Sequence, residues 1–93
     1  MKILGYEFKV DTSKSFTEDR VGGDLSVPRQ LMRIAGDLAP EQIESTMIHE
    51  IIEAINGIMQ LELKEKQVCA LEVGIWGALH DNGVDLSPLF KKK

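Results

Sequence analysis

The segment from Pro40 to Gly57 constrains the fold most, because its apolar and polar side chains separate onto opposite halves of a helix. Pro40 suits a first helical position, and Asn56-Gly57 is a typical helix stop. The apolar half consists of Ile43, Met47, Ile48, Ile51, Ile52, Ala54 and Ile55. We therefore expect a helix over residues 40–57 that packs one side into a core and leaves the other side for a functional site.

The residues before this helix have the pattern of strands and turns. Apolar residues alternate with glycine or charged residues over residues 4–10, which predicts one half-buried strand. Residues 11–24 are mostly polar and predict a loop. The segments 25–27 and 30–35 predict a hairpin, with Pro28-Arg29 at its turn.

A second helix is expected over residues 64–82, and residues 83–93 are expected to form a tail. The strands and the loop occupy residues 1–36. At 93 residues, the chain has the length of a single domain over residues 1–93. The expected fold is α+β, with a short antiparallel sheet of about three strands packed on two main helices.

The composition excludes several classes of function. The net charge is −4, whereas nucleic-acid surfaces need clustered Lys and Arg, so we expect no nucleic-acid partner. No apolar run reaches the ~20 residues of a membrane span, and the sequence has no signal-peptide pattern. Cys69 is the single cysteine, so it cannot form an intramolecular disulfide, and we expect it to be a small buried apolar residue. These features predict a cytoplasmic protein without membrane association.

The polar half of the first helix carries His49-Glu50-x-x-Glu53, one substitution away from the H-E-x-x-H helix of zinc hydrolases. His49 and Glu53 are four residues apart, so they share a helix face and could hold one ion. Glu50 projects about 100° round the helix and could act as general base toward an attacking water. A histidine with a carboxylate predicts Zn²⁺ first, with Mn²⁺ or Fe²⁺ less favoured.

In the second helix, Glu72 falls within an apolar arc. A carboxylate in such an arc needs a partner, because an unpaired buried charge costs several kcal/mol. A metal ion would be one partner, which makes Glu72 a candidate third ligand, and a lysine or arginine would be another. The apolar arc consists of Val68, Cys69, Leu71, Ile75, Trp76, Ala78 and Leu79.

The opposite side of the second helix carries the small residues Ala70, Gly74 and Gly77. Each helical glycine costs about 1 kcal/mol relative to alanine, so close packing against another backbone is the expected compensation. The sequence therefore predicts a contact of this face with the N-terminal strands or with a second chain, that is, a homo-oligomer.

Two segments carry a resemblance to a known family. They are Leu-Ala-Pro-Glu-Gln-Ile-Glu-Ser-Thr-Met-Ile-His-Glu-Ile-Ile-Glu-Ala-Ile and Lys-Glu-Lys-Gln-Val-Cys-Ala-Leu-Glu-Val-Gly-Ile-Trp-Gly-Ala-Leu-His-Asp-Asn. Together with the preceding hairpin, they resemble small phage and prophage proteins related to the ImmA/IrrE-type zincin-like metallopeptidases. The resemblance covers roughly residues 22–82.

The resemblance implies a minimal zincin, in which a short sheet packs on an active-site helix and a second helix carries the last ligand. By position, His49 would be the first ligand and Glu50 the general base, while Glu53 takes the place of the second ligand. The sequence departs from the family twice. Position 53 is Glu where full peptidases have His, and the place of the third ligand falls near Gln67, a poor zinc ligand.

Two functions follow as hypotheses. In the first, the protein is a metallopeptidase that acts on a protein substrate held along the edge of the sheet. In the second, it is a catalytically inactive interaction module of a phage or mobile element. Both predict a protein or peptide partner in the cytoplasm of a bacterial host cell.

Overall fold

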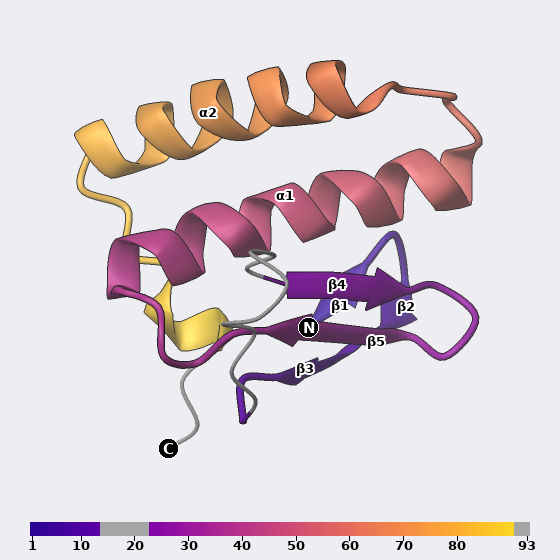
Figure 1. The fold of residues 1–93 in the computed structure, drawn as a ribbon, viewed down its shortest axis with the longest axis horizontal. Helices are drawn as coiled ribbons and strands as arrows, with labels where there is room; N and C mark the ends of the chain where they lie inside the picture. Colours follow the sequence, from indigo (N-terminus) through magenta and orange to yellow (C-terminus); the bar gives the residue numbers. More distant parts are fainter. Residues whose placement is uncertain (14–22, 91–93) are drawn as a thin grey trace.

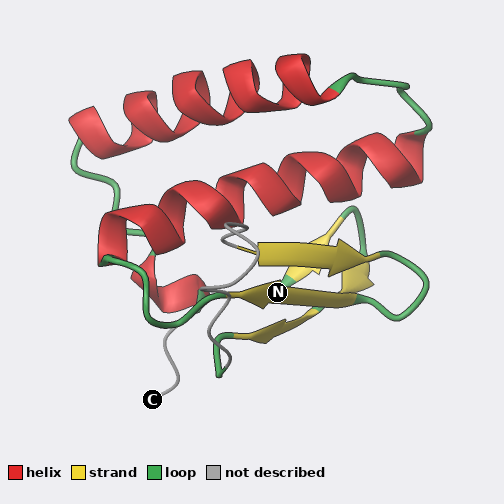
Figure 2. Cartoon of the chain, in the orientation of Figure 1, coloured by secondary structure: helices red, strands yellow, loops and turns green. Residues whose placement is uncertain are grey.

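The computed structural model describes residues 1–13 and 23–90, and these residues form an α+β fold in three layers (Figure 1). The sheet lies on one side of α1, and α2 covers the other side, so α1 is the middle layer. Figure 2 shows the strands and helices gathered into separate layers. The elements are β1 Lys2–Ile3, β2 Tyr6–Glu7, β3 Lys9–Asp11, β4 Gly23–Ser26, β5 Leu31–Ile34, α1 Pro40–Met59, α2 Glu65–Asp81 and the 3₁₀ helix η1 Ser87–Leu89.

The N-terminal residues form a tight hairpin followed by a third strand, and the prediction of one strand over residues 4–10 is wrong. The chain turns between β1 and β2 at Leu4 (φ 52°) and Gly5 (φ 85°). Two successive left-handed residues suit a two-residue hairpin turn. Leu4 is therefore exposed, whereas Phe8, beyond the hairpin, is buried. The alternation correctly indicates that Phe8 is buried. It does not indicate the turn, because leucine rarely has a positive φ and therefore is not a turn signal.

The main sheet has the order β3-β5-β4. The predicted β4–β5 hairpin is confirmed, with antiparallel pairing and a Gln30 N–H that donates to the Val27 carbonyl at 3.0 Å. The β3–β5 pair is parallel, so the expectation of an antiparallel sheet is wrong for this pair. Alternation of apolar and polar residues indicates which face of a strand is buried, but it does not indicate whether neighbouring strands run parallel or antiparallel. The predicted loop 11–24 is shorter in the structure, because Asp11 ends β3 and Gly23 begins β4. Residues 14–22 lie outside the described residues.

Two apolar clusters cover α1 on two sides. The larger cluster joins α1 to the sheet and the hairpin and consists of Ile3, Phe8, Met32, Ile34, Ile43, Met47 and Ala54. The smaller cluster joins α1 to α2 and consists of Ile48, Ile52 and Val68. The apolar half of the predicted helix is thus divided between two neighbours, which fixes the rotation of α1 about its own axis.

The first helix runs beyond its predicted stop, and Asn56-Gly57 lies inside it. The helix ends at Gln60, which is left-handed with φ 53°, and Glu62 in the connection also has a positive φ of 60°. The Asn56 side chain binds both backbone groups of Leu63, accepting from its N–H at 2.9 Å and donating to its carbonyl at 3.2 Å. Asn56 therefore shapes the connection between the helices instead of ending α1.

The second helix matches its predicted extent, but its apolar arc lies differently. Val68 is buried, whereas Leu71, Ile75 and Cys69 are exposed, which corrects the expected stripe and the expected burial of the thiol. The residues predicted as a tail also differ, because they contain η1 and pack back onto the domain. Leu86 contacts the smaller cluster and Phe90 the larger one. Among the described residues, no helix combines the length and the apolar character that crossing a membrane requires.

Gly23 marks a close approach between β4, β5 and α1. A Cβ at this position would lie 2.5 Å from the Arg33 carbonyl oxygen and 3.1 Å from a methyl group of Thr46. We expect Gly23→Ala to lower the free energy of unfolding by about 1–3 kcal/mol, because the sheet must shift to accept the methyl group. Urea denaturation measures this change.

The control is Gly57→Ala, because its Cβ would meet only a Val27 methyl group at 3.4 Å. Alanine at this helical position should raise the free energy of unfolding by roughly 0.5–1 kcal/mol. Equal effects of the two substitutions would contradict a close approach at Gly23.

Candidate functional site

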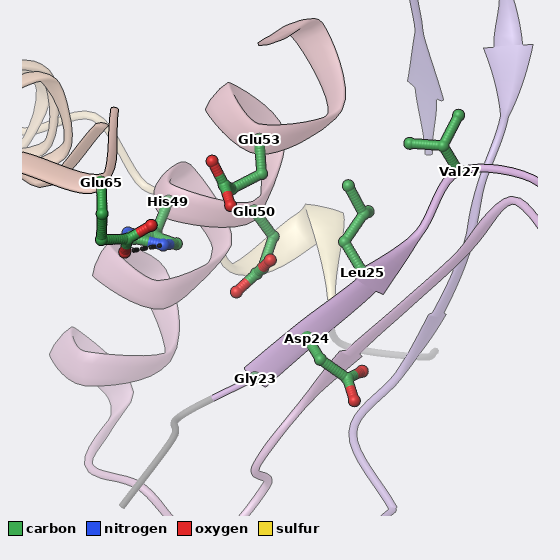
Figure 3. A pocket seen from close by; sticks show the side chains of 8 residues that line it. All are labelled: Gly23, Asp24, Leu25, Val27, His49, Glu50, Glu53 and Glu65. Atoms are coloured by element: carbon green, nitrogen blue, oxygen red, sulfur yellow. Dashed lines mark ion pairs between the residues drawn. The ribbon is translucent and has the colours of Figure 1, made fainter. Parts of the chain in front are cut away.

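An open pocket of about 470 Å³ lies between α1 and β4 (Figure 3). The side chains of Glu50 and Glu53 extend from α1 toward this pocket, whereas His49 lies against Glu65 of α2. The residues that line the pocket are Gly23, Asp24, Leu25, Val27, His49, Glu50, Glu53 and Glu65. The structure thus places the predicted motif at a pocket. The side chains of His49 and Glu53, which were expected to hold one ion, point in different directions.

His49 is held between carboxylates of α2 on both ring nitrogens. Its Nδ1 lies 2.8 Å from Glu72 Oε1, and its Nε2 lies 3.3 Å from Glu65 Oε1. Burial opposes the charge of the imidazole, but the hydrogen bond to Glu72 and the charges of Glu50, Glu72 and Glu65 outweigh it and raise the pKa of His49. The imidazole is therefore an electrostatic link between α1 and α2.

Glu72 has two partners on α1. Besides His49, its Oε2 accepts a hydrogen bond from Ser45 Oγ at 2.5 Å. The carboxylate is half-buried in the arc where the sequence placed it, and both of its oxygens are bound. Neither partner is a lysine or an arginine. Ser45 was not singled out by sequence, although it stands four residues before His49 on the same helix face.

His49, Glu65 and Cys69 bring a nitrogen, an oxygen and a sulfur within 4.8 Å of one another. Glu65 Oε1 lies 3.3 Å from His49 Nε2 and 3.6 Å from Cys69 Sγ. Around tetrahedral zinc, ligands at their usual bond lengths lie roughly 3.3–3.7 Å apart. The two distances from Glu65 agree with this spacing, and an imidazole, a carboxylate and a thiol are donor types that zinc accepts.

The hydrogen bond from His49 Nδ1 to Glu72 also suits a metal site. Histidine ligands of zinc usually donate their second N–H to a carboxylate, which fixes the tautomer and the ring orientation. Glu72 occupies this supporting position, with Ser45 behind it. The geometry thus places Glu72 next to His49, outside the group of three potential ligand atoms.

Glu53, predicted as a ligand, lines the pocket with Glu50. Among the described residues, the one cluster of three potential ligand atoms is His49, Glu65 and Cys69, so Glu53 and Glu72 are outside it. Glu65 and Cys69 were missed as candidates. A signal was present, because Glu65, Cys69 and Glu72 are spaced i, i+4 and i+7 and share one face of α2.

Glu50 is the buried carboxylate of the pocket, with only 6% of its surface exposed. Its pKa is raised to about 7, mainly by burial and also by the negative charges of Glu53, Asp24 and Glu65, while the nearby His49 acts to lower the pKa. A carboxyl group that titrates near neutral pH can both accept and return a proton. Glu50 can therefore exchange a proton near neutral pH, and its role as a general base stays a prediction.

Comparison with protein-family models, with curated proteins and with solved structures gives no match for this chain. The resemblance to zincin-like proteins stays a prediction from the residues quoted above.

Stability should fall with rising pH because of Glu50. Its folded pKa of about 7 exceeds the ordinary 4.5, so its contribution is complete below pH 4.5 and is lost as the pH rises through 7. We expect Glu50→Gln to remove about 2 kcal/mol of this loss between pH 5 and 8, as measured by urea denaturation. Glu53→Gln, on the more exposed neighbour, should change the slope less. An unchanged slope in Glu50→Gln would contradict the raised pKa.

Replacing Glu72 by Gln should lower the pKa of His49, because the amide keeps a hydrogen-bond acceptor but loses the charge that favours imidazolium. NMR titration of the imidazole protons measures this shift. Glu41→Gln is the control, since Glu41 lies 3.6 Å from His80 rather than near His49. An equal His49 pKa in the wild type and in Glu72→Gln would show that the pair does not form in solution.

Proposed function

We propose that this chain is a zincin-like protein of a phage or mobile element that binds a divalent metal ion and hydrolyses a peptide bond. The observation that carries the proposal is Glu50, a buried carboxyl group with a pKa of about 7 at a pocket that also contains His49 and Glu65. The described residues that line this pocket include no lysine or arginine, and a buried carboxyl group with a shifted pKa beside potential metal ligands is typical of a general base in a hydrolase.

The metal would be held by His49 Nε2, Glu65 and the Cys69 thiolate, with Glu72 supporting the histidine. A bound Zn²⁺ would supply Lewis acidity and lower the pKa of a water molecule, and Mn²⁺ or Fe²⁺ would suit the thiolate less well. Without a cation, burial and the carboxylate of Glu65 raise the pKa of the thiol. Metal affinity should therefore increase with pH.

The proposed substrate is an extended peptide. In the described sheet β4 is an edge strand, and Gly23, Asp24 and Leu25 from this strand line the pocket that contains Glu50. A peptide that adds to an edge strand gains backbone hydrogen bonds and lays its carbonyl groups along the strand. This would bring a scissile carbonyl to the pocket side of α1, within reach of Glu50 as the residue that moves the proton.

A second candidate function is an inactive interaction module with the same fold. It is favoured by the contacts of His49, whose two ring nitrogens both lie next to α2 carboxylates. These ion pairs, the hydrogen bond of Ser45 to Glu72 and the smaller apolar cluster link the two helices without a metal ion. In this case the protein or peptide partner would bind without being cleaved.

Elemental mass spectrometry of protein purified without a histidine tag tests the metal site. We expect close to one equivalent of zinc in the wild type, its loss in His49→Ala and Cys69→Ser, and its retention in Glu53→Gln. Loss in Glu53→Gln with retention in Cys69→Ser would support the ligand set His49, Glu53 and Glu72 instead. No bound metal, and no thermal stabilisation by added zinc, would favour the interaction module.

Glu50→Gln tests the hydrolase itself. The amide keeps the shape of the side chain but cannot accept a proton, so this variant should bind zinc as the wild type does and lose peptide cleavage by about 100-fold or more. A library of short peptides, read by mass spectrometry, measures cleavage. Equal cleavage by the wild type and the zinc-loaded variant would exclude Glu50 as the base.

A further inference from the structure

The outer face of α2, defined as Gln67, Ala70, Leu71, Gly74, Gly77 and Ala78, is uncharged between Lys66 and Asp81 at its two ends. Val73 and Ile75 flank it with 68% and 42% of their surface exposed. A surface helix normally has charged or polar residues on its solvent side, and contiguous apolar surface of this kind marks a contact site. The helix therefore exposes an apolar side in addition to the one that covers α1.

No neighbour among residues 1–13 and 23–90 accounts for the glycines of this face. α2 is the outermost layer, and α1 contacts its opposite side (Figure 1). A Cβ at Gly74 or Gly77 would have no atom within 4 Å, so neither glycine is required by a close neighbour. The predicted contact with the N-terminal strands is thus wrong, because the strands lie across α1. Each glycine still costs the helix about 1 kcal/mol.

We propose that the outer face of α2 is the interface of a homodimer, in which two α2 helices pack antiparallel across a two-fold axis at Gly74. In this arrangement the residue pairs are symmetric about position 74. Leu71 then faces the partner's Gly77, and Ala70 faces the partner's Ala78. A large side chain meets a small one on both sides of the axis, which is the self-complementary contact that a two-fold interface requires.

The charges at the two ends of α2 also select a second copy in this orientation. Lys66 lies at the start of the helix and Asp81 at its end, and both are exposed. Antiparallel pairing about Gly74 puts Lys66 level with the partner's Asn82, one residue from the partner's Asp81, so the two opposite charges can reach each other, whereas parallel pairing would place like charges together. The dipoles of two antiparallel helices are also favourably arranged.

The dimer should be reversible and independent of the proposed metal site. A 17-residue helix is about 25 Å long, so one helix pair buries less than the ~800 Å² per partner of a standard interface. His49, Glu65 and Cys69 lie toward α1 rather than on the outer face. Dimer formation and metal binding can therefore be tested separately.

Sedimentation velocity over micromolar to millimolar concentration tests the dimer. We expect a shift from monomer to twice the monomer mass, and Gly74→Arg should weaken association by more than about tenfold. The same substitution should leave the dilute monomer at least as stable, because arginine favours a helix more than glycine does and meets open space. Met59→Lys, at another exposed apolar residue, is the control and should associate as the wild type does.

Charge reversal tests the orientation. Lys66→Asp and Asp81→Lys should each weaken the dimer, and the double variant should restore it, because the swapped charges again face each other in an antiparallel pair. A protein that stays monomeric at millimolar concentration would overturn the proposal. So would association that Gly74→Arg does not change, or a double variant that is weaker than both single variants.

Discussion

The structure depends on the burial of α1 between two unlike neighbours. The sheet covers one side through Met32 and Ile34, and α2 covers another through Val68. A helix covered on two sides has little freedom to rotate, so its remaining polar residues have fixed directions. His49 must face α2 and Glu50 must face β4, although they are neighbours in sequence. The divergence of the motif is therefore a consequence of packing.

Much of the fold follows from periodicity and turn residues in the sequence. The β4–β5 hairpin with Pro28-Arg29 and the start of α1 at Pro40 were predictable because their signals are local. The turn at Leu4 and the parallel β3–β5 pair were not. A leucine with positive φ has no local signature, and strand direction depends on contacts between segments that are distant in the chain.

The candidate site was predictable on α1 but only in part on α2. A motif at fixed helical spacing identified His49 and Glu50, and an apolar arc identified Glu72. Cys69 was assigned to the core because its type is often buried, whereas it is exposed where α2 packs on α1 through Val68. Which residues of two helices meet depends on their crossing, and this is a tertiary property that a helical wheel does not contain.

The connection between the helices has a consequence for how the site could change in evolution. Gln60 and Glu62 are left-handed without being glycine, a conformation that costs roughly 1–3 kcal/mol per residue and persists only where the surroundings impose it. The two hydrogen bonds between the Asn56 side chain and the Leu63 backbone constrain this connection. A residue inserted or deleted here would rotate α2 and turn Glu65 and Glu72 away from His49. The arrangement of the candidate site thus depends on the length of the connection that precedes Glu65.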